Sequence, residues 1–426
     1  MKKSSLSLNT LWMLAGNFSR VFMQAVYFVI VARALGADGF GAFVGVTALV
    51  GIVSPFIGLG SGNILIKNVS RNHSIYFSEW GTALGKLLWS SLLLMSLLVL
   101  GCNLFLPGTI PFILIVCVVL SDGLLMRLLD MCGQAFQAFE RMKWTAYLSF
   151  LISASRLLGS VVLLILGSKV TLEYWAIIYL SSTLLSSGLA TFFAIFQLGK
   201  PQFNVKTWFS NLLEGIYFSV SLSSQNIYND IDKTLLTRLS TLEASGIFAA
   251  AYRVIDVAFT PIRSLLNATY PKFFQHGELG VKNGYLYTKK IIPFALIYSI
   301  VIGIAMYTFA PILPLFLGED FENSIEIVKL LSVIPLLKTI HYFAADTISG
   351  AGYQGLRSFI QIFIAIFNII LNFILIPEYS WLGAVYTGII SNALLGILLW
   401  ISVGVLIKKE QGLDKNKHHV ELQKQA

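Results

Sequence analysis

The chain has 426 residues, of which 56% are hydrophobic and only 12% are charged. A soluble globular domain carries about 25% charged residues, so this composition excludes an ordinary soluble protein and indicates a polytopic membrane protein. The formal net charge of +9 by itself would suit a nucleic-acid-binding protein. Its distribution along the chain instead follows a membrane topology, and we expect no nucleic acid partner.

The sequence offers no motif for cofactor chemistry. Cys102, Cys117 and Cys132 lie in apolar stretches, without the spacing of a disulfide framework or a metal site. There is neither a Gly-rich phosphate loop nor a nucleophile elbow. We therefore expect no metal and no cofactor. Transport would have to draw on an ion gradient, on the gradient of the substrate or on another protein.

Apolar runs of about 20 residues predict an all-α protein with about twelve transmembrane helices. The runs lie at residues 10–33, 40–66, 82–105, 110–133, 145–167, 173–198, 212–236, 244–270, 290–317, 324–350, 356–376 and 381–407. The run at 212–236 is nearly as polar as a loop. We predict a helix there because Ser219, Ser223, Asn226 and Asp230 share one helical face, and because an internal repeat requires a helix.

The first predicted helix carries a polar stripe. Asn17, Arg20, Gln24 and Tyr27 follow one another at intervals of three or four residues, which places them on one face. A charge that faces lipid is costly. Arg20 is therefore expected to face the interior of a bundle or an aqueous cavity.

The beginning of the chain recurs in its second half. Aligning Arg33 with Arg238 also aligns Gly41 with Gly246. The polar stripe has counterparts in this alignment: Gln225 for Arg20 and Asn229 for Gln24. We predict two pseudo-symmetric six-helix bundles at residues 1–198 and 213–407, joined by a cytoplasmic linker at 199–212. The polar tail at 408–426 is expected to be disordered.

Basic residues give the orientation. About nineteen Lys and Arg residues lie in or beside the terminal segments and even-numbered loops, against about four in the odd-numbered loops. Cytoplasmic loops carry the excess of positive charge, so both termini are predicted to be cytoplasmic. The acidic segment at 319–326 is then predicted to face outward.

Two motifs carry a resemblance to a known family. The string ARALGADGFGAF at residues 32–43 follows a helix containing GNFSR, and GLGSGNILIKNVSR at 58–71 ends the second predicted helix. Together they resemble bacterial Wzx-type O-antigen and polysaccharide flippases. These belong to the polysaccharide transporter branch of the multidrug/oligosaccharidyl-lipid/polysaccharide exporter superfamily. Further similarity lies at 346–388.

The resemblance implies a transporter rather than an enzyme. The cargo would be an undecaprenyl diphosphate-linked oligosaccharide, such as an O-antigen repeat unit for lipopolysaccharide. It would move from the cytoplasmic to the periplasmic leaflet of a bacterial inner membrane by alternating access, coupled to an ion. Membrane lipids would surround the protein, and polysaccharide polymerase and chain-length machinery would be its partners.

Ionisable and polar residues inside the predicted spans form the candidate site, because such residues point into a bundle rather than toward lipid. Arginine can clamp a diphosphate, and amides can bond sugar hydroxyls. The candidate cavity cations are Arg20, Arg253, Arg263, Arg156, Arg127 and Lys338. The resemblance favours the first three, since the first, second, seventh and eighth helices line the central groove in such proteins. The candidate polar lining residues are Asn17, Gln24, Gln225, Asn226 and Asn229. The candidates for ion coupling are Asp230, Asp232 and Asp256.

Several charged candidates also have a structural interpretation, as ion pairs inside the protein or, for Arg127 and Arg263, as side chains that reach the cytoplasmic interface. The spacing allows pairs of Arg127 with Asp130, of Arg253 with Asp256, and of Asp230 with Lys233. His341 is more simply a hydrogen-bond partner between helices than a proton relay.

Two other functions stay open. A cation-coupled exporter of drugs or small molecules would have the same fold but would need a net acidic cavity, whereas basic residues here rival the acidic ones. An integral-membrane polysaccharide polymerase or acyltransferase would need a sizeable outward loop or a cluster of His, Asp and Glu at one membrane face. The sequence shows neither.

Overall fold

The computed structural model describes the backbone of residues 3–167, 170–203 and 211–425. It describes the side chains of this part except those of 3–20, 103, 221, 225, 271 and 412–425. All regular elements within these ranges are helices, so the fold is all-α as predicted. The chain forms two compact units: unit 1 is Met1–Ala249 with Leu315–Phe321, and unit 2 is Ala250–Pro314 with Glu322–Ala426.

Unit 1 is built around the long first helix. Its elements are α1 (Lys3–Val53), η1 (Ser54–Phe56), α2 (Ser61–Arg71), η2 (His73–Ile75), α3 (Tyr76–Phe105), α4 (Phe112–Val118), the π-helix η3 (Val119–Leu125), α5 (Met126–Ala138), α6 (Met142–Leu166), α7 (Leu172–Leu198), α8 (Leu212–Leu239) and the start of α9 (Leu242–Gly277). The short segments α11 (Leu313–Leu317) and η7 (Glu319–Phe321) lie mainly in this unit. Helix α1 packs against α6 and α8, and α5 packs against α2 and α7.

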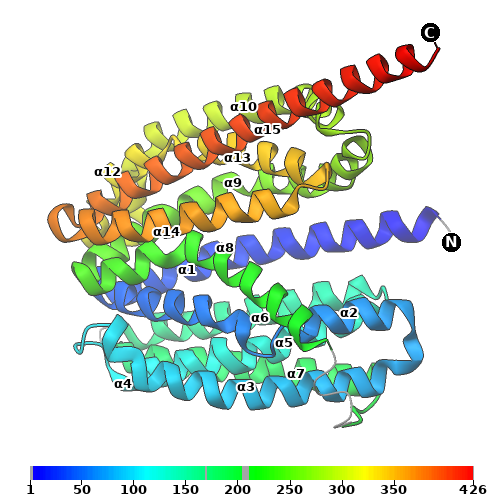
Figure 1. Ribbon diagram of the computed structural model, residues 1–426. Coiled ribbons are helices and arrows are strands. Elements are labelled where there is room, and N and C mark those ends of the chain that lie inside the picture. The colour runs from blue at the N-terminus through cyan, green and yellow to red at the C-terminus, as the bar shows by residue number, and fades with distance from the viewer. Residues whose placement is uncertain (1–2, 168–169, 204–210, 426) are drawn as a thin grey trace. The chain divides into compact units, whose positions relative to one another are not determined.

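Unit 2 contains the rest of α9, α10 (Val281–Phe309), η6 (Ala310–Ile312), α12 (Ser324–Leu331), α13 (Ile334–Gly350), α14 (Gln354–Tyr379) and α15 (Trp381–Gln425). Helix α13 packs against α10 and α15, and α15 packs against α14, as Figure 1 shows. Glu410 near the end of α15 accepts hydrogen bonds from the N–H groups of Val281 (2.8 Å) and Lys282 (3.3 Å). A carboxylate at a helix N-terminus is favourable, so this contact ties α15 to α10.

Nine helices of the described ranges are long and apolar enough to cross a membrane, and the bent pair Glu319–Leu331 with Ile334–Gly350 would make a tenth. One of the nine, Val21–Phe56, has 36 residues. It would be about 54 Å long if straight, against a hydrocarbon thickness of about 30 Å. It is broken at Gly36, which has φ 67° and ψ 178°, between the first two predicted spans. Helix α8 is not among the nine. The count of twelve stays a prediction.

The predicted second span at 40–66 is wrong in its second half. Helix α1 ends at Val53, and a turn with positive φ at Gly58, Leu59 and Gly60 precedes α2. The cause is Pro55, which lacks the N–H that would bond the carbonyl of Gly51 one turn earlier. The disordered tail expected at 408–426 also differs from the structure, because α15 continues to Gln425. Residues 204–210 of the predicted linker lie outside the described residues.

The predicted internal repeat has a counterpart in the packing of unit 1. A Cβ atom on Gly41 would collide with the backbone of Leu242 and Gly246, and a Cβ atom on Gly246 would collide with that of Ala37 and Gly41. Residues 37 and 242, like 41 and 246, are equivalent in the repeat. A contact that is reciprocal between equivalent residues is what a two-fold axis produces. The packing therefore supports the repeat, and it requires glycine at both positions.

Candidate functional site

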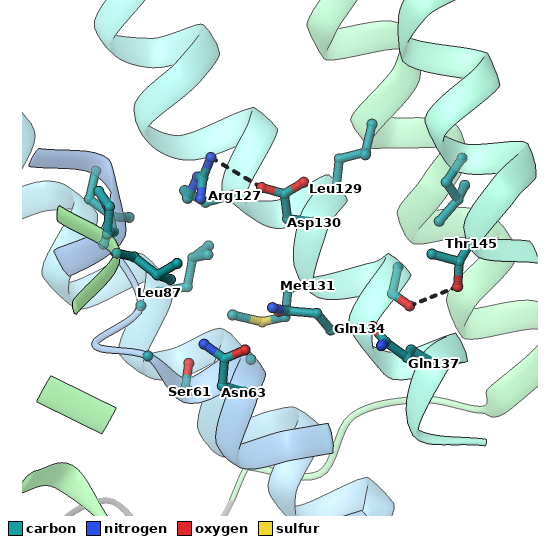
Figure 2. A pocket seen from close by; sticks show the side chains of 18 of the residues that line it. Ser61, Asn63, Leu87, Arg127, Leu129, Asp130, Met131, Gln134, Gln137 and Thr145 are labelled. Atoms are coloured by element: carbon teal, nitrogen blue, oxygen red, sulfur yellow. Dashed lines mark hydrogen bonds and ion pairs between the residues drawn. The ribbon is translucent and has the colours of Figure 1, made fainter. Parts of the chain in front are cut away.

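A cavity of about 260 Å³ lies inside unit 1. Its wall is formed by the turn that follows α1 and by side chains of α2, α3, α5, α6 and α8. Figure 2 shows the ion pair of Arg127 and Asp130 on one side of this space and the amides of Asn63, Gln134 and Gln137 on the other. The cavity adjoins the short connection between α5 and α6, which the sequence predicts to be cytoplasmic.

Helix α5 supplies most of the polar groups of the cavity wall. Arg127, Asp130, Gln134 and Gln137 follow one another at intervals of three or four residues, and all four line the cavity. The Nη2 atom of Arg127 lies 3.1 Å from Oδ2 of Asp130. Arg127 therefore lines the cavity and is also half of an ion pair, and its role as a cargo-binding cation stays a prediction.

Several polar groups of this wall have no partner in the described part of the chain. Ser61 Oγ and Arg127 Nε are buried without a hydrogen bond there. The side-chain amides of Asn63, Gln134 and Gln137 make no hydrogen bond to another described residue either. Buried polar groups nearly always find partners, and a polar cavity of this size admits water or a hydroxyl-bearing ligand. The cavity is thus suited to a ligand that both donates and accepts several hydrogen bonds.

Gly62 sets the position of one of these amides. A Cβ atom at Gly62 would collide with Oε1 and Cδ of Gln134. The missing side chain allows α2 and α5 to approach closely, and it holds the Gln134 carbonyl against the backbone of α2. Any larger residue at position 62 would push this amide out of its place in the cavity wall.

Arg156, a predicted cavity cation, lies in an ion pair inside unit 1. Its Nη2 is 2.8 Å from Oδ1 of Asp122. Tyr179 donates its hydroxyl to both oxygens of this carboxylate, at 2.8 and 2.9 Å, and the Arg156 guanidinium lies 4.4 Å from the centre of the Tyr179 ring. The sequence reading did not single out Asp122, although an acid in an apolar run was the available signal. Asp122 lies on the π-helix η3, an irregularity that often marks functional sites.

The polar face of α8 is used partly for packing. Ser223 Oγ donates to the carbonyl of Ile52 and Asn226 Nδ2 to that of Gly51, each at 2.7 Å. The Gly51 carbonyl is the one that Pro55 leaves without its helical partner, and it accepts instead from Asn226 and, at 3.3 Å, from Ser54 Oγ. The predicted lining residue Asn226 thus binds α1.

The coupling candidates of α8 differ in their surroundings. Asp230 forms an ion pair with Lys233, as the structural interpretation proposed, whereas Asp232 is buried. Asn229 and the stripe residue Gln24 of α1 are half-buried. The side chains of Asn17, Arg20 and Gln225 lie outside the described residues, so their predicted roles stay predictions.

In unit 2 the candidates lie on α9 and α13. Asp256 is 4.0 Å from Nη2 of Arg263, two turns away, and Arg253 is half-buried. Lys338 is buried, with its ammonium over the rings of Tyr252 and Phe259.

His341 on α13 links two helices of unit 2. Its Nε2 lies 3.2 Å from Oδ1 of Asn392 on α15. This contact agrees with the interpretation of His341 as a hydrogen-bond partner between helices.

Comparison with known proteins places these features in context. Residues 6–276 match the family described as "Polysaccharide biosynthesis protein". An uncharacterized membrane protein of Methanocaldococcus jannaschii is 22% identical over 412 residues, covering 91% of this chain and 95% of that protein. A probable low-salt glycan biosynthesis flippase of Haloferax volcanii is 20% identical over 384 residues, which cover 86% of this chain and 77% of that protein.

The fold is similar to that of a solved transporter. A multidrug resistance MATE family transporter of the MOP superfamily, in an inward-facing conformation, superposes with a TM-score of 0.73 at 14% identity. The match covers 91% of this chain and 96% of that protein. The chain is thus a multi-pass membrane protein with a transporter fold.

Proposed function

This chain belongs to the polysaccharide biosynthesis protein family, and from that premise we propose that it is a flippase for a lipid-linked oligosaccharide. The cargo is an undecaprenyl diphosphate-linked oligosaccharide, such as an O-antigen repeat unit. It moves from the cytoplasmic to the periplasmic leaflet of a bacterial inner membrane, in which both termini of the protein are cytoplasmic. The similarity to a probable glycan biosynthesis flippase agrees with this proposal.

The observation that carries the proposal is the cavity of unit 1. It offers three unpartnered amides, a buried serine hydroxyl and an arginine Nε within a bundle of apolar helices. A sugar ring presents hydroxyls that donate and accept at once, and such groups satisfy amides and hydroxyls equally well. A volume of about 260 Å³ is suited to one or two sugar rings rather than to a whole glycan. We assign the cavity to one sugar residue of the cargo.

Alternating access would move the cargo. In this mechanism the two halves of the protein rock, the sugars and diphosphate cross through a polar groove, and the polyprenyl tail stays in lipid. Arg20, Arg253 and Arg263 are the proposed groove cations. The proposed coupling candidates of α8 are Asp230, which is paired with Lys233, and the buried Asp232.

The test is flipping by the purified protein in proteoliposomes. An undecaprenyl diphosphate oligosaccharide is placed in one leaflet, and its appearance in the other is followed by an added sugar-modifying enzyme. The double variant Gln134→Leu/Gln137→Leu should flip the cargo slowly, because it removes two of the cavity amides. The matched control is Gln197→Leu, an exposed glutamine of unit 1 outside the cavity.

One outcome would overturn the proposal. If the wild-type protein moves no lipid-linked oligosaccharide, with or without ion gradients, but exports a cationic dye from the same liposomes, the protein is a small-molecule exporter.

A further inference from the structure

Unit 2 contains a buried cation that has no ion pair with any residue whose side chain is described. This cation is Lys338, which is 2% exposed and lies on α13, in the bent helix pair that would make the tenth span. A charged side chain is costly inside a membrane unless it is paired or hydrogen-bonded. The groups around the Lys338 ammonium therefore indicate whether its charge is paired within the protein or is available to a ligand.

Among the described residues, the ammonium of Lys338 lies over two aromatic rings, and His341, one turn along α13, is also near it. Its Nζ lies 4.8 Å from the ring centre of Tyr252 and 5.9 Å from that of Phe259, both on α9. It makes no hydrogen bond and no ion pair with any of these residues. Ring faces attract a cation, but they accept no hydrogen bond from the three N–H groups of an ammonium and carry no negative charge.

Among the described residues, no acidic side chain forms an ion pair with Lys338. Asp256 and Asp346 pair with Arg263 and Arg357, and Glu410 accepts hydrogen bonds from the N–H groups at the start of α10. The remaining described acids of unit 2 are exposed: Glu278, Glu322, Glu326 and Glu378. The segments whose side chains are not described contain two acids, Asp414 and Glu421, and both belong to the C-terminal tail. The counter-charge of Lys338 must therefore come from outside this part of the chain.

We propose that Lys338 is the receptor for a phosphate-class anion, and that Tyr252 and Phe259 hold its ammonium while no anion is bound. The four-carbon stem of lysine allows the ammonium to leave the rings and reach a phosphate oxygen. Lysine binds phosphate as a point charge and needs no fixed geometry. This inference rests on the proposed function, since the anion it assigns is the diphosphate that joins the polyprenyl chain to the sugars.

Binding to the full-length protein in lipid nanodiscs tests the proposal. The probe is farnesyl diphosphate, a short polyprenyl diphosphate, and farnesol serves as the same lipid without the anion. The variant Lys338→Met should weaken farnesyl diphosphate binding roughly tenfold to a hundredfold, the range expected for hydrogen bonds to a charged group. Lys338→Arg should keep most of the affinity, because it keeps the charge.

Two further variants separate anion binding from a structural role. Lys329 of α12 is half-buried and lies 5.6 Å from the ring centre of Tyr307, so Lys329→Met removes a lysine from a tyrosine ring elsewhere in unit 2. It should leave the affinity unchanged. Tyr252→Leu removes one of the two rings that the ammonium contacts but keeps the ammonium. The affinity for farnesyl diphosphate should stay equal or rise. If the contact of Lys338 with Tyr252 were purely structural, both Lys338→Met and Tyr252→Leu would lose binding.

The outcomes also identify the source of the anion. Binding of farnesyl diphosphate that depends on Lys338 and resists competition by inorganic diphosphate supports the lipid-linked anion. Equal competition by inorganic diphosphate supports the anion site with a free phosphate compound as its ligand. Equal affinity of wild type and Lys338→Met for farnesyl diphosphate would overturn the proposal. If binding depends on Lys338 but the wild type flips no lipid-linked oligosaccharide, the anion site stands and the proposed function fails.

Discussion

Two cations of this chain, the half-buried Arg156 and the buried Lys338, each lie against a tyrosine ring but differ in their charged partners. The guanidinium of Arg156 in unit 1 lies 4.4 Å from a tyrosine ring, and the ammonium of Lys338 in unit 2 lies 4.8 Å from another. Arg156 also has the carboxylate of Asp122 at 2.8 Å, whereas Lys338 has no carboxylate among the described residues. A tyrosine ring beside the charge is therefore common to both cations, and the carboxylate beside Arg156 is what distinguishes them.

The comparison extends to neutral polar groups of unit 1. Asn226 of α8 is committed to the carbonyl of Gly51, whereas Gln134 and Gln137 of α5 face a cavity without a protein partner. A group that already has a partner holds the fold together. A group left without one, beside a space that a ligand can enter, is available for binding.

The largest expected effect on stability comes from breaking the ion pair of Arg156 and Asp122. Asp122→Ala should lower the free energy of unfolding by about 3–5 kcal/mol, because it leaves the Arg156 side chain, which is only 18% exposed, without its carboxylate. Thermal and denaturant unfolding of the detergent-solubilised protein would measure this loss. The control Asp130→Ala breaks a pair in which both side chains are more exposed, with Arg127, and should cost less than about 1 kcal/mol. Equal losses in the two variants would show that the Asp122 pair is not special.

Removing Lys338, the cation without a carboxylate partner among the described residues, should not lower the free energy of unfolding. Lys338→Met replaces a buried charge by an apolar side chain of similar length, so the free energy of unfolding should stay the same or rise by up to about 3 kcal/mol. The same unfolding experiments measure it. A clear loss of stability would mean that Lys338 has a counter-charge in the free protein and is structural, like Arg156.

A smaller effect on stability is expected for Asn226 of α8, whose amide donates to the Gly51 carbonyl. Asn226→Leu should lower the free energy of unfolding by about 0.5–1.5 kcal/mol, because it removes the amide hydrogen bond while Ser54 still donates to the Gly51 carbonyl. Asn229→Leu is the matched control on the same helix, since Asn229 has no hydrogen bond to another described residue. The control should change the stability by no more than about 0.5 kcal/mol. A similar cost in both variants would argue against a specific role of the Gly51 contact.

The smallest effect on stability is expected in the cavity. Gln137→Leu should change the free energy of unfolding by no more than about 0.5 kcal/mol, because this amide has no protein partner to lose. Its flipping rate for the lipid-linked oligosaccharide should nevertheless fall roughly threefold to tenfold, which is the worth of one hydrogen bond to a sugar hydroxyl. Parallel unfolding and proteoliposome assays would show this separation. An unchanged flipping rate would remove Gln137 from the sugar site.

Properties that depend on neighbours along one helix were predictable. The intervals of three and four residues between Arg127, Asp130, Gln134 and Gln137 place them on one helical face, and all four line the cavity. The alignment of Gly41 with Gly246 predicted a repeat, and the two glycines contact each other. The predicted end of the second span at residue 66 was wrong, although Pro55, which ends the helix, is apparent in the sequence.

The sequence by itself determined that this is an all-helical membrane protein with an internal repeat and polar stripes on its spans. These follow from hydrophobic runs and from the 3.6-residue period, which are local properties of the chain. Only the tertiary structure decided that Arg156 pairs with Asp122, that Asn226 donates to the Gly51 carbonyl, and that the ammonium of Lys338 lies over the ring of Tyr252. The partner of a side chain depends on which helices pack together and on their relative shift along the helix axes, and neither can be read from the separation of two residues in the sequence.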